Sequence, residues 1–132
     1  MITSVENTET PDFSTVITTA DLKAHLRVTH SDEDTLIQAY RSAACLWVEN
    51  YCNTRLTNHT VNIYASGFSS LIELPIGPCI SVTSVKYSTA KDAALNTLAA
   101  SEYYAETNRN PAVIRFITLP SVDTHNPSPV KI

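Results

Sequence analysis

Three residues with metal-binding or nucleophilic side chains recur at intervals of seven positions, namely Cys45, Cys52 and His59. Cysteine and histidine are common zinc ligands, and a cysteine activated by a histidine is a nucleophile in many enzymes. In a helix, however, seven residues rise by roughly 10 Å, so Cys45 and Cys52 cannot form a disulfide and are poorly placed to share one zinc ion. Whether this stretch is helical therefore decides whether these residues can form a site.

A long helix is predicted over about residues 32–53, because acidic residues suited to a first helical turn precede apolar residues at helical spacing. The apolar residues are Leu36, Ile37, Tyr40, Ala44, Trp47, Val48 and Tyr51. This stripe is expected to face the core and to bury Trp47. Cys45 and Cys52 lie to its side and His59 lies beyond the helix, which favours free thiols over a metal or catalytic site. We therefore expect no metal, no cofactor and no enzymatic activity, and keep a metal- or thiol-dependent enzyme as a third function class.

A second, weaker apolar strip on the same helix consists of Ala39, Ala43 and Leu46. It is displaced from the main stripe, whereas a chain of 132 residues is expected to form a single domain with one core. The strip is interpreted either as a contact with another subunit or as ordinary scattered apolar residues of the surface.

Two segments precede the long helix. Residues 1–14 contain three acids, a proline and few apolar groups, which predicts a flexible N-terminal arm. Thr18 and Asp21 have the spacing of a capping box, and two leucines follow four residues apart. This pattern predicts a short helix over about residues 19–27.

The pattern changes to that of β-strands beyond residue 58, and strands are expected between about residues 59 and 117. Alternating and β-branched runs predict strands at 61–65 and 71–74, a further run over 80–87 whose change of phase suits a β-bulge, and a final strand pair at 102–106 and 112–117, with a loop over 88–101. The expected fold class is α+β: a short helix and a long amphipathic helix packed with a small, mainly antiparallel β-sheet. This domain is expected to span residues 15–118.

Residues 119–132 contain three prolines, which disfavour both a helix and a central strand. The segment is therefore predicted to be an extended, unpaired C-terminal tail. Such a tail commonly becomes ordered against a partner, as an added strand or in a groove. Its candidate docking residues are Pro127, Pro129, Val130 and Ile132.

Composition and charge narrow the function classes further. The chain is 43% hydrophobic and 17% charged without a long apolar run, so no membrane span is expected. The N-terminal residues MITSVENTET lack the basic start and apolar stretch of a signal peptide, which predicts a cytosolic, reducing compartment with free thiols. A net charge of −4 argues against a general electrostatic grip on nucleic acid, which requires clustered lysines and arginines.

Three blocks of the sequence resemble the head–tail connector family of long-tailed double-stranded DNA bacteriophages, also called adaptor, head-completion or DNA-packaging proteins. The blocks are KAHLRVTHSDEDTLIQAYRSAACLWVENYCNTRL, then IELPIGPCISVTSVKY, then LAASEYY with NPAVIRF. They cover roughly residues 17–117 and contain no catalytic motif.

The resemblance implies a structural protein in the neck of the virion, made in the cytoplasm of the host bacterium. Its implied form is a homo-oligomeric ring beneath the portal that extends the DNA channel and offers an attachment surface. The implied partners are other copies of the chain, the portal protein, a downstream neck or tail-completion protein, and double-stranded DNA that passes through without sequence-specific binding. The alternative is a DNA-packaging accessory protein that binds nucleic acid directly.

A ring around DNA suggests roles for residues already singled out. Asp32, Glu33 and Asp34 are candidates for the channel wall, because excess carboxylates repel phosphate. Capping of the long helix explains the same three residues. The strip of Ala39, Ala43 and Leu46 is the candidate subunit interface, and the tail is the candidate contact with the portal or a neighbouring subunit.

Overall fold

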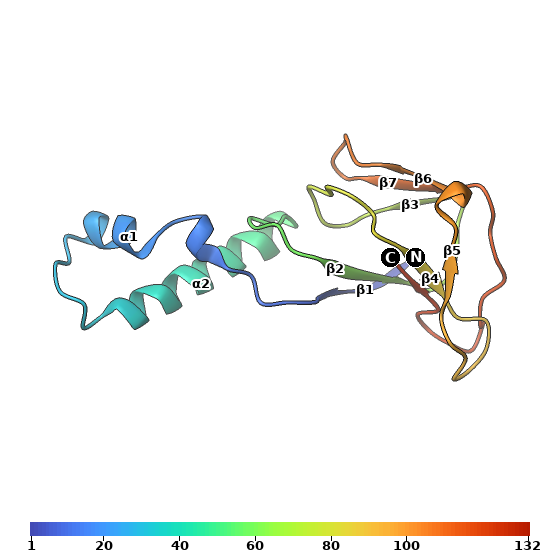
Figure 1. Cartoon of the computed structure of the whole chain (residues 1–132), viewed down its shortest axis with the longest axis horizontal. Helices are drawn as coiled ribbons and strands as arrows, with labels where there is room; N and C mark the ends of the chain where they lie inside the picture. The colour runs from blue at the N-terminus through green and yellow to red at the C-terminus, as the bar shows by residue number, and fades with distance from the viewer. The chain divides into compact units, whose positions relative to one another are not determined.

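The computed structural model describes all 132 residues and divides the chain into two compact units (Figure 1). The helical unit comprises Glu9–His59, and the sheet unit comprises Met1–Thr8 together with Thr60–Ile132. The helical unit is thus inserted between the first two strands of the sheet unit. Helices and antiparallel sheets in separate parts of the chain give the α+β class that the sequence predicted. None of the helices combines the length and the apolar character needed to cross a lipid bilayer.

The helical unit contains η1 (Phe13–Thr15), α1 (Thr19–Leu26) and α2 (Asp34–Cys52). Helix α1 begins with the predicted cap, in which Thr18 Oγ1 accepts a hydrogen bond from the Asp21 backbone N at 3.1 Å. Arg27 follows α1 and Asn53 follows α2, each in the left-handed conformation that commonly ends a helix. Both helices lie within two residues of their predicted bounds.

The sheet unit contains a five-stranded and a three-stranded sheet, and every strand pair is antiparallel. The five-stranded sheet has the order β1 (Ile2–Asn7), β2 (Val61–Ala65), β8 (Val130–Lys131), β4 (Val85–Tyr87), β5 (Asn96–Leu98). The three-stranded sheet has the order β3 (Leu71–Glu73), β7 (Val113–Phe116), β6 (Tyr103–Glu106), and η2 (Ala100–Glu102) precedes β6. Strands β2, β3, β6 and β7 match the predicted ones, and β4 occupies the end of the run predicted over 80–87, whereas β5 lies where only a loop was expected.

Both sheets contribute to one core of buried apolar side chains. These are Ile63, Ala65, Ile72, Leu74, Val85, Leu98, Ala112, Ile114, Phe116 and Val130. Phe68 packs edge-to-face against Phe116, with ring centroids 5.1 Å apart. The hydrophobic interior of the chain is therefore concentrated in the sheet unit.

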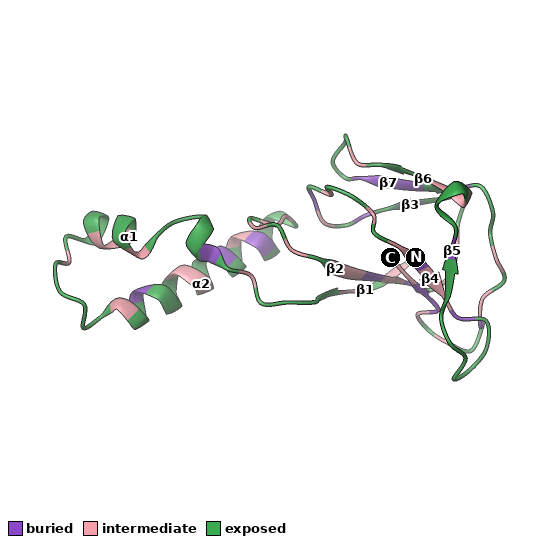
Figure 2. Ribbon diagram, viewed as in Figure 1, coloured by how far each residue is buried: buried purple, intermediate pink, exposed green.

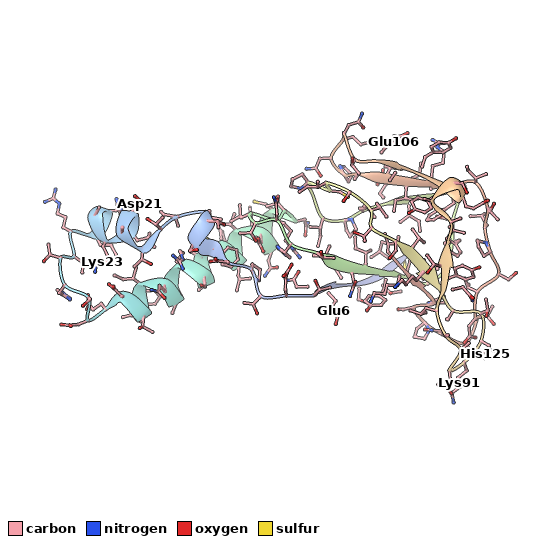
Figure 3. All side chains as sticks on the ribbon, viewed as in Figure 1. Glu6, Asp21, Lys23, Lys91, Glu106 and His125 are labelled. Atoms are coloured by element: carbon pink, nitrogen blue, oxygen red, sulfur yellow. The ribbon has the colours of Figure 1, made fainter.

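The first residues do not form the flexible arm that their composition predicted. Ile2–Asn7 forms β1, which pairs with β2. On this strand the Glu6 carboxylate (Figure 3) accepts hydrogen bonds from Asn62 Nδ2 at 3.2 Å and from Tyr64 Oη at 2.9 Å. Phe13 is buried within the helical unit. The prediction was wrong because backbone pairing with β2 and the side-chain hydrogen bonds to Glu6 hold the segment in place. These partners lie more than fifty residues away, so the local composition does not reveal them.

The Pro-rich C-terminal segment is not the unpaired tail that was predicted. Val130–Lys131 forms β8, which lies between β2 and β4 in the middle of the five-stranded sheet. Reciprocal backbone hydrogen bonds of 3.0 and 2.8 Å between Ile63 and Ile132 extend this pairing. Pro129 has no amide donor, but its carbonyl accepts a hydrogen bond from the Ser88 backbone N at 2.9 Å. Pro129 is therefore tolerated because it takes part in the pairing through its carbonyl, while Ile132 provides a backbone donor further along the segment.

Candidate functional site

Helix α2 is the longest element of the chain, and only a narrow side of it is buried. Its buried residues are Ile37, Cys45 and Glu49. Arg41 lies on the same side, because these four positions are spaced by four residues, and its Nη1 donates to the Ile17 carbonyl at 3.2 Å. Figure 2 shows purple only in short segments of α2. Most of the surface of α2 is therefore exposed and accessible to another protein chain.

Glu49 is the most buried residue of α2, with 1% of its surface exposed. Its Oε1 accepts a hydrogen bond from the Leu56 backbone N at 2.8 Å, which holds the chain as it leaves the helix. Polar groups thus provide part of the packing inside the helical unit. The buried apolar residues of this unit are only Phe13, Ile37 and Cys45.

The large aromatic residues of α2 are exposed, contrary to the prediction that its main apolar stripe faces the core. Trp47 is 65% exposed and Tyr51 is 76% exposed. Tyr40 and Leu36 are exposed as well. Of the predicted stripe, only Ile37 is buried. The prediction was wrong because α2 has apolar residues around most of its circumference, so periodicity alone does not tell which side packs inward.

The exposed apolar residues of α2 form one continuous surface, which we call the outer face. It consists of Leu36, Ala39, Tyr40, Ala43, Ala44, Leu46, Trp47 and Tyr51. At about 100° per residue these positions span roughly 160° of the helix circumference; the one other α2 residue within this arc is the exposed Asn50, and none of the residues in it is charged. The rings of Trp47 and Tyr51 stack within this face, with centroids 5.1 Å apart. The strip predicted as a subunit interface lies inside it, and an exposed, aromatic, uncharged surface of this kind is typical of a protein–protein contact.

The three cysteines and His59 do not form a chemical site. Cys45 is buried, Cys52 is exposed and Cys79 is half-buried, and all three thiols are free. No three His, Cys, Asp or Glu side chains come together in an arrangement that holds a metal ion. Burial raises the pKa of the Cys79 thiol, which disfavours the nucleophilic thiolate. His59 Nδ1 lies 3.1 Å from Thr57 Oγ1, a contact within one turn.

The three acidic residues at the start of α2 have different surroundings. Asp34 forms an ion pair with Lys23 of α1, with 2.7 Å between Oδ1 and Nζ; Lys23 is labelled in Figure 3. Asp32 is exposed, and its Oδ2 lies 3.9 Å from His30 Nδ1. Glu33 is the N-cap residue but makes no side-chain capping bond. Asp34 therefore links the two helices, whereas Asp32 and Glu33 keep their carboxylates in solvent.

The four predicted docking residues lie in or beside β8. Pro129 and Val130 are buried in the sheet unit, Ile132 is half-buried and Pro127 is exposed. The premise of a free tail is wrong, and the side chains of Pro129 and Val130 are accessible only if the sheet opens.

The chain is similar to a protein in a solved structure described as the neck of an empty GTA particle computed with C6 symmetry. The TM-score is 0.80 at 20% sequence identity, and the match covers 98% of this chain and 69% of that one, which shows a shared fold. No curated protein matches the sequence.

The family comparison is more specific. Residues 16–110 match the family described as phage gp6-like head–tail connector protein. This range contains α1, α2, the outer face and strands β2 to β6, and it agrees with the resemblance seen in the sequence blocks. Because the match spans well over half of the sequence, the chain belongs to the phage gp6-like head–tail connector family, whose members are structural components of the junction between head and tail rather than enzymes.

Proposed function

We propose that copies of this chain form a closed ring in the phage neck, beneath the portal, and that DNA passes through its channel. The observation that carries the proposal is the family match over residues 16–110. The similarity in fold to a protein of a neck structure computed with C6 symmetry supports it. A closed ring of identical subunits requires a heterologous contact, in which one surface of each copy meets a different surface of the next.

The ring proposal assigns roles to two sets of exposed residues. Ala39, Ala43 and Leu46 are available for the contact between subunits because all three lie on the outer face. Asp32 and Glu33 are proposed to lie near the channel, where their solvent-exposed carboxylates repel the DNA backbone. Asp34 contributes less repulsion, because Lys23 neutralises its charge.

The ends of the ring are proposed to bind the portal on one side and the next neck or tail-completion protein on the other. Pro127 and Ile132 keep accessible surface and are retained as candidates for one of these contacts. Contacts through Pro129 and Val130 require partial opening of the five-stranded sheet, since both are buried there.

Electron microscopy of the full chain mixed with its portal protein tests this function. The expected result is a ring stacked coaxially on the portal, with cyclic symmetry and an open channel. Binding to double-stranded DNA that weakens steeply with salt, without any ring on the portal, would instead establish the DNA-packaging accessory role. The net charge of −4 argues against that second outcome.

A further inference from the structure

We propose that the outer face of α2 is the contact between neighbouring copies, with an aromatic row on one copy packed against an alanine row on the next. The aromatic row is Tyr40, Trp47 and Tyr51, and the alanine row is Ala39, Ala43 and Leu46. The inference rests on the ring proposed above and adds which surfaces meet within it. The two rows lie side by side on one helix, so each copy presents both halves of a heterologous contact.

The shapes of the two rows are complementary. Trp47 and Tyr51 stack with their ring planes 9° apart, so the aromatic row projects as a ridge along α2. Ala39 and Ala43 have short side chains one turn apart, so we infer that the helix surface is low beside the ridge, and we call this row the groove. Helices pack by placing ridges of one into grooves of the other, and small residues let the two backbones approach closely. A ridge with a neighbouring groove therefore fits a second copy of the same helix.

The charge distribution also favours a second copy as the occupant. Each chain has a net charge of −4, so two copies repel one another wherever their acidic residues meet. The outer face has no charged residue, so two such faces can come together without burying an unpaired carboxylate. A basic partner would be recognised by acidic residues, and these lie outside the outer face.

The small core of the helical unit gives a further reason for this face to be covered. Three apolar residues of the unit are buried, whereas eight apolar residues of α2 alone are exposed on one side. Monomeric proteins rarely leave a contiguous apolar surface of this kind uncovered. Contact between copies would give the helical unit the apolar burial that it lacks within one chain.

Trp47 provides a direct measurement, because it is the only tryptophan in the chain. Sedimentation over a concentration series measures assembly, and quenching of Trp47 fluorescence by acrylamide measures the accessibility of the outer face. We expect quenching to fall and the emission to shift to shorter wavelength as oligomers form. Oligomers with Trp47 as accessible as in the monomer would overturn this inference and leave the ring intact. A chain that stays monomeric both alone and with its portal would overturn the ring and this contact together.

Two variants test the aromatic row and the alanine row independently of each other. Trp47→Ala removes the ridge and Ala43→Glu places a charge in the groove. Each alone should weaken self-association at least about thirtyfold, which corresponds to about 2 kcal/mol. The control is Tyr104→Ala, which removes an equally exposed aromatic residue (64%) from β6 and should assemble normally. Circular dichroism should show that all three variants remain folded.

Mixing the two variants tests the arrangement itself. The intact ridge of the Ala43→Glu chain can pack into the intact groove of the Trp47→Ala chain, but neither chain can extend the contact further. The expected product is a one-to-one heterodimer that does not grow. Two folded variants that form no heterodimer, or a Trp47→Ala chain that assembles as well as the unaltered chain, would show that the ridge and the groove do not meet.

Discussion

The rings of Trp47 and Tyr51 stack in the solvent, with centroids 5.1 Å apart and planes separated by 9°. Two stacked aromatic side chains are normally found inside a hydrophobic core. Here both rings keep most of their surface exposed. Truncating one of the two side chains removes its stacking contact with the other but opens no cavity inside the protein. The stability of the isolated chain should therefore depend little on this pair.

The first prediction follows for the monomer. Trp47→Ala should change the free energy of unfolding by less than about 1 kcal/mol, because the side chain leaves no internal cavity. Ile37→Ala, on the buried side of the same helix, should cost about 2–5 kcal/mol. Urea denaturation followed by circular dichroism, at a concentration where the chain is monomeric, measures both. Equal losses for the two variants would mean that the orientation of α2 is wrong.

The second prediction concerns β8. Deleting residues 121–132 removes the strand between β2 and β4, so the two halves of the five-stranded sheet lose their connection. The truncated chain should lose the amide protection and chemical-shift dispersion of the sheet unit in nuclear magnetic resonance spectra. Lys131→Ala is the matched control, because it leaves the backbone pairing in place. A truncated chain with an intact sheet spectrum would contradict the position of β8.

The third prediction compares two replacements of the buried Glu49. Glu49→Ala removes the acceptor of the Leu56 amide and leaves a buried donor unpaired together with a cavity, which should cost about 2–4 kcal/mol. Glu49→Gln keeps an acceptor oxygen of the same reach and should cost clearly less. Chemical denaturation of both variants measures the difference. Similar losses would show that the charge, rather than the hydrogen bond, holds the end of α2.

The fourth prediction concerns the Glu6 carboxylate at the β1 edge. Hydrogen bonds from Asn62 and then Tyr64 favour the ionised form and hold the pKa of Glu6 below its usual value, while the same contact raises the pKa of Tyr64. A lowered pKa in the folded state stabilises the protein above the unfolded-state pKa, and this contribution is lost as the pH falls through the folded-state value. In a carboxylate titration by nuclear magnetic resonance, Asn62→Ala should raise the pKa of Glu6 more than Tyr64→Phe does. An unchanged Glu6 titration in both variants would remove these bonds as the cause.

Local signals in the sequence predicted the helices well, because their ends depend on neighbouring residues. The Thr18 cap lies three residues from its partner, and Arg27 and Asn53 end their helices through their own backbone conformation. The hairpin of β6 and β7 was found for the same reason, since its strands are adjacent in sequence.

The errors concern contacts between distant parts of the chain. Strand β1 pairs with a strand more than fifty residues away, and β8 with strands on two separate segments, so neither has a local pattern that identifies it. The orientation of α2 was missed because its buried side is held by Arg41 and Glu49 as well as by Ile37. A helix with apolar residues on both sides needs such polar anchors to be recognised before its outer face can be assigned.

The central position of β8 has a consequence for the order in which a newly made chain folds. Synthesis proceeds from the N-terminus, so β2 and β4 emerge from the ribosome well before residues 130–131, which must fit between them. Contacts in the helical unit are closer in sequence and can form early in translation, whereas the five-stranded sheet is completed only after β8 has left the ribosome. A ribosome-bound nascent chain therefore presents a folded α2, with its outer face exposed, before its sheet is complete, so that copies made on one messenger RNA can meet through α2 before either has finished folding.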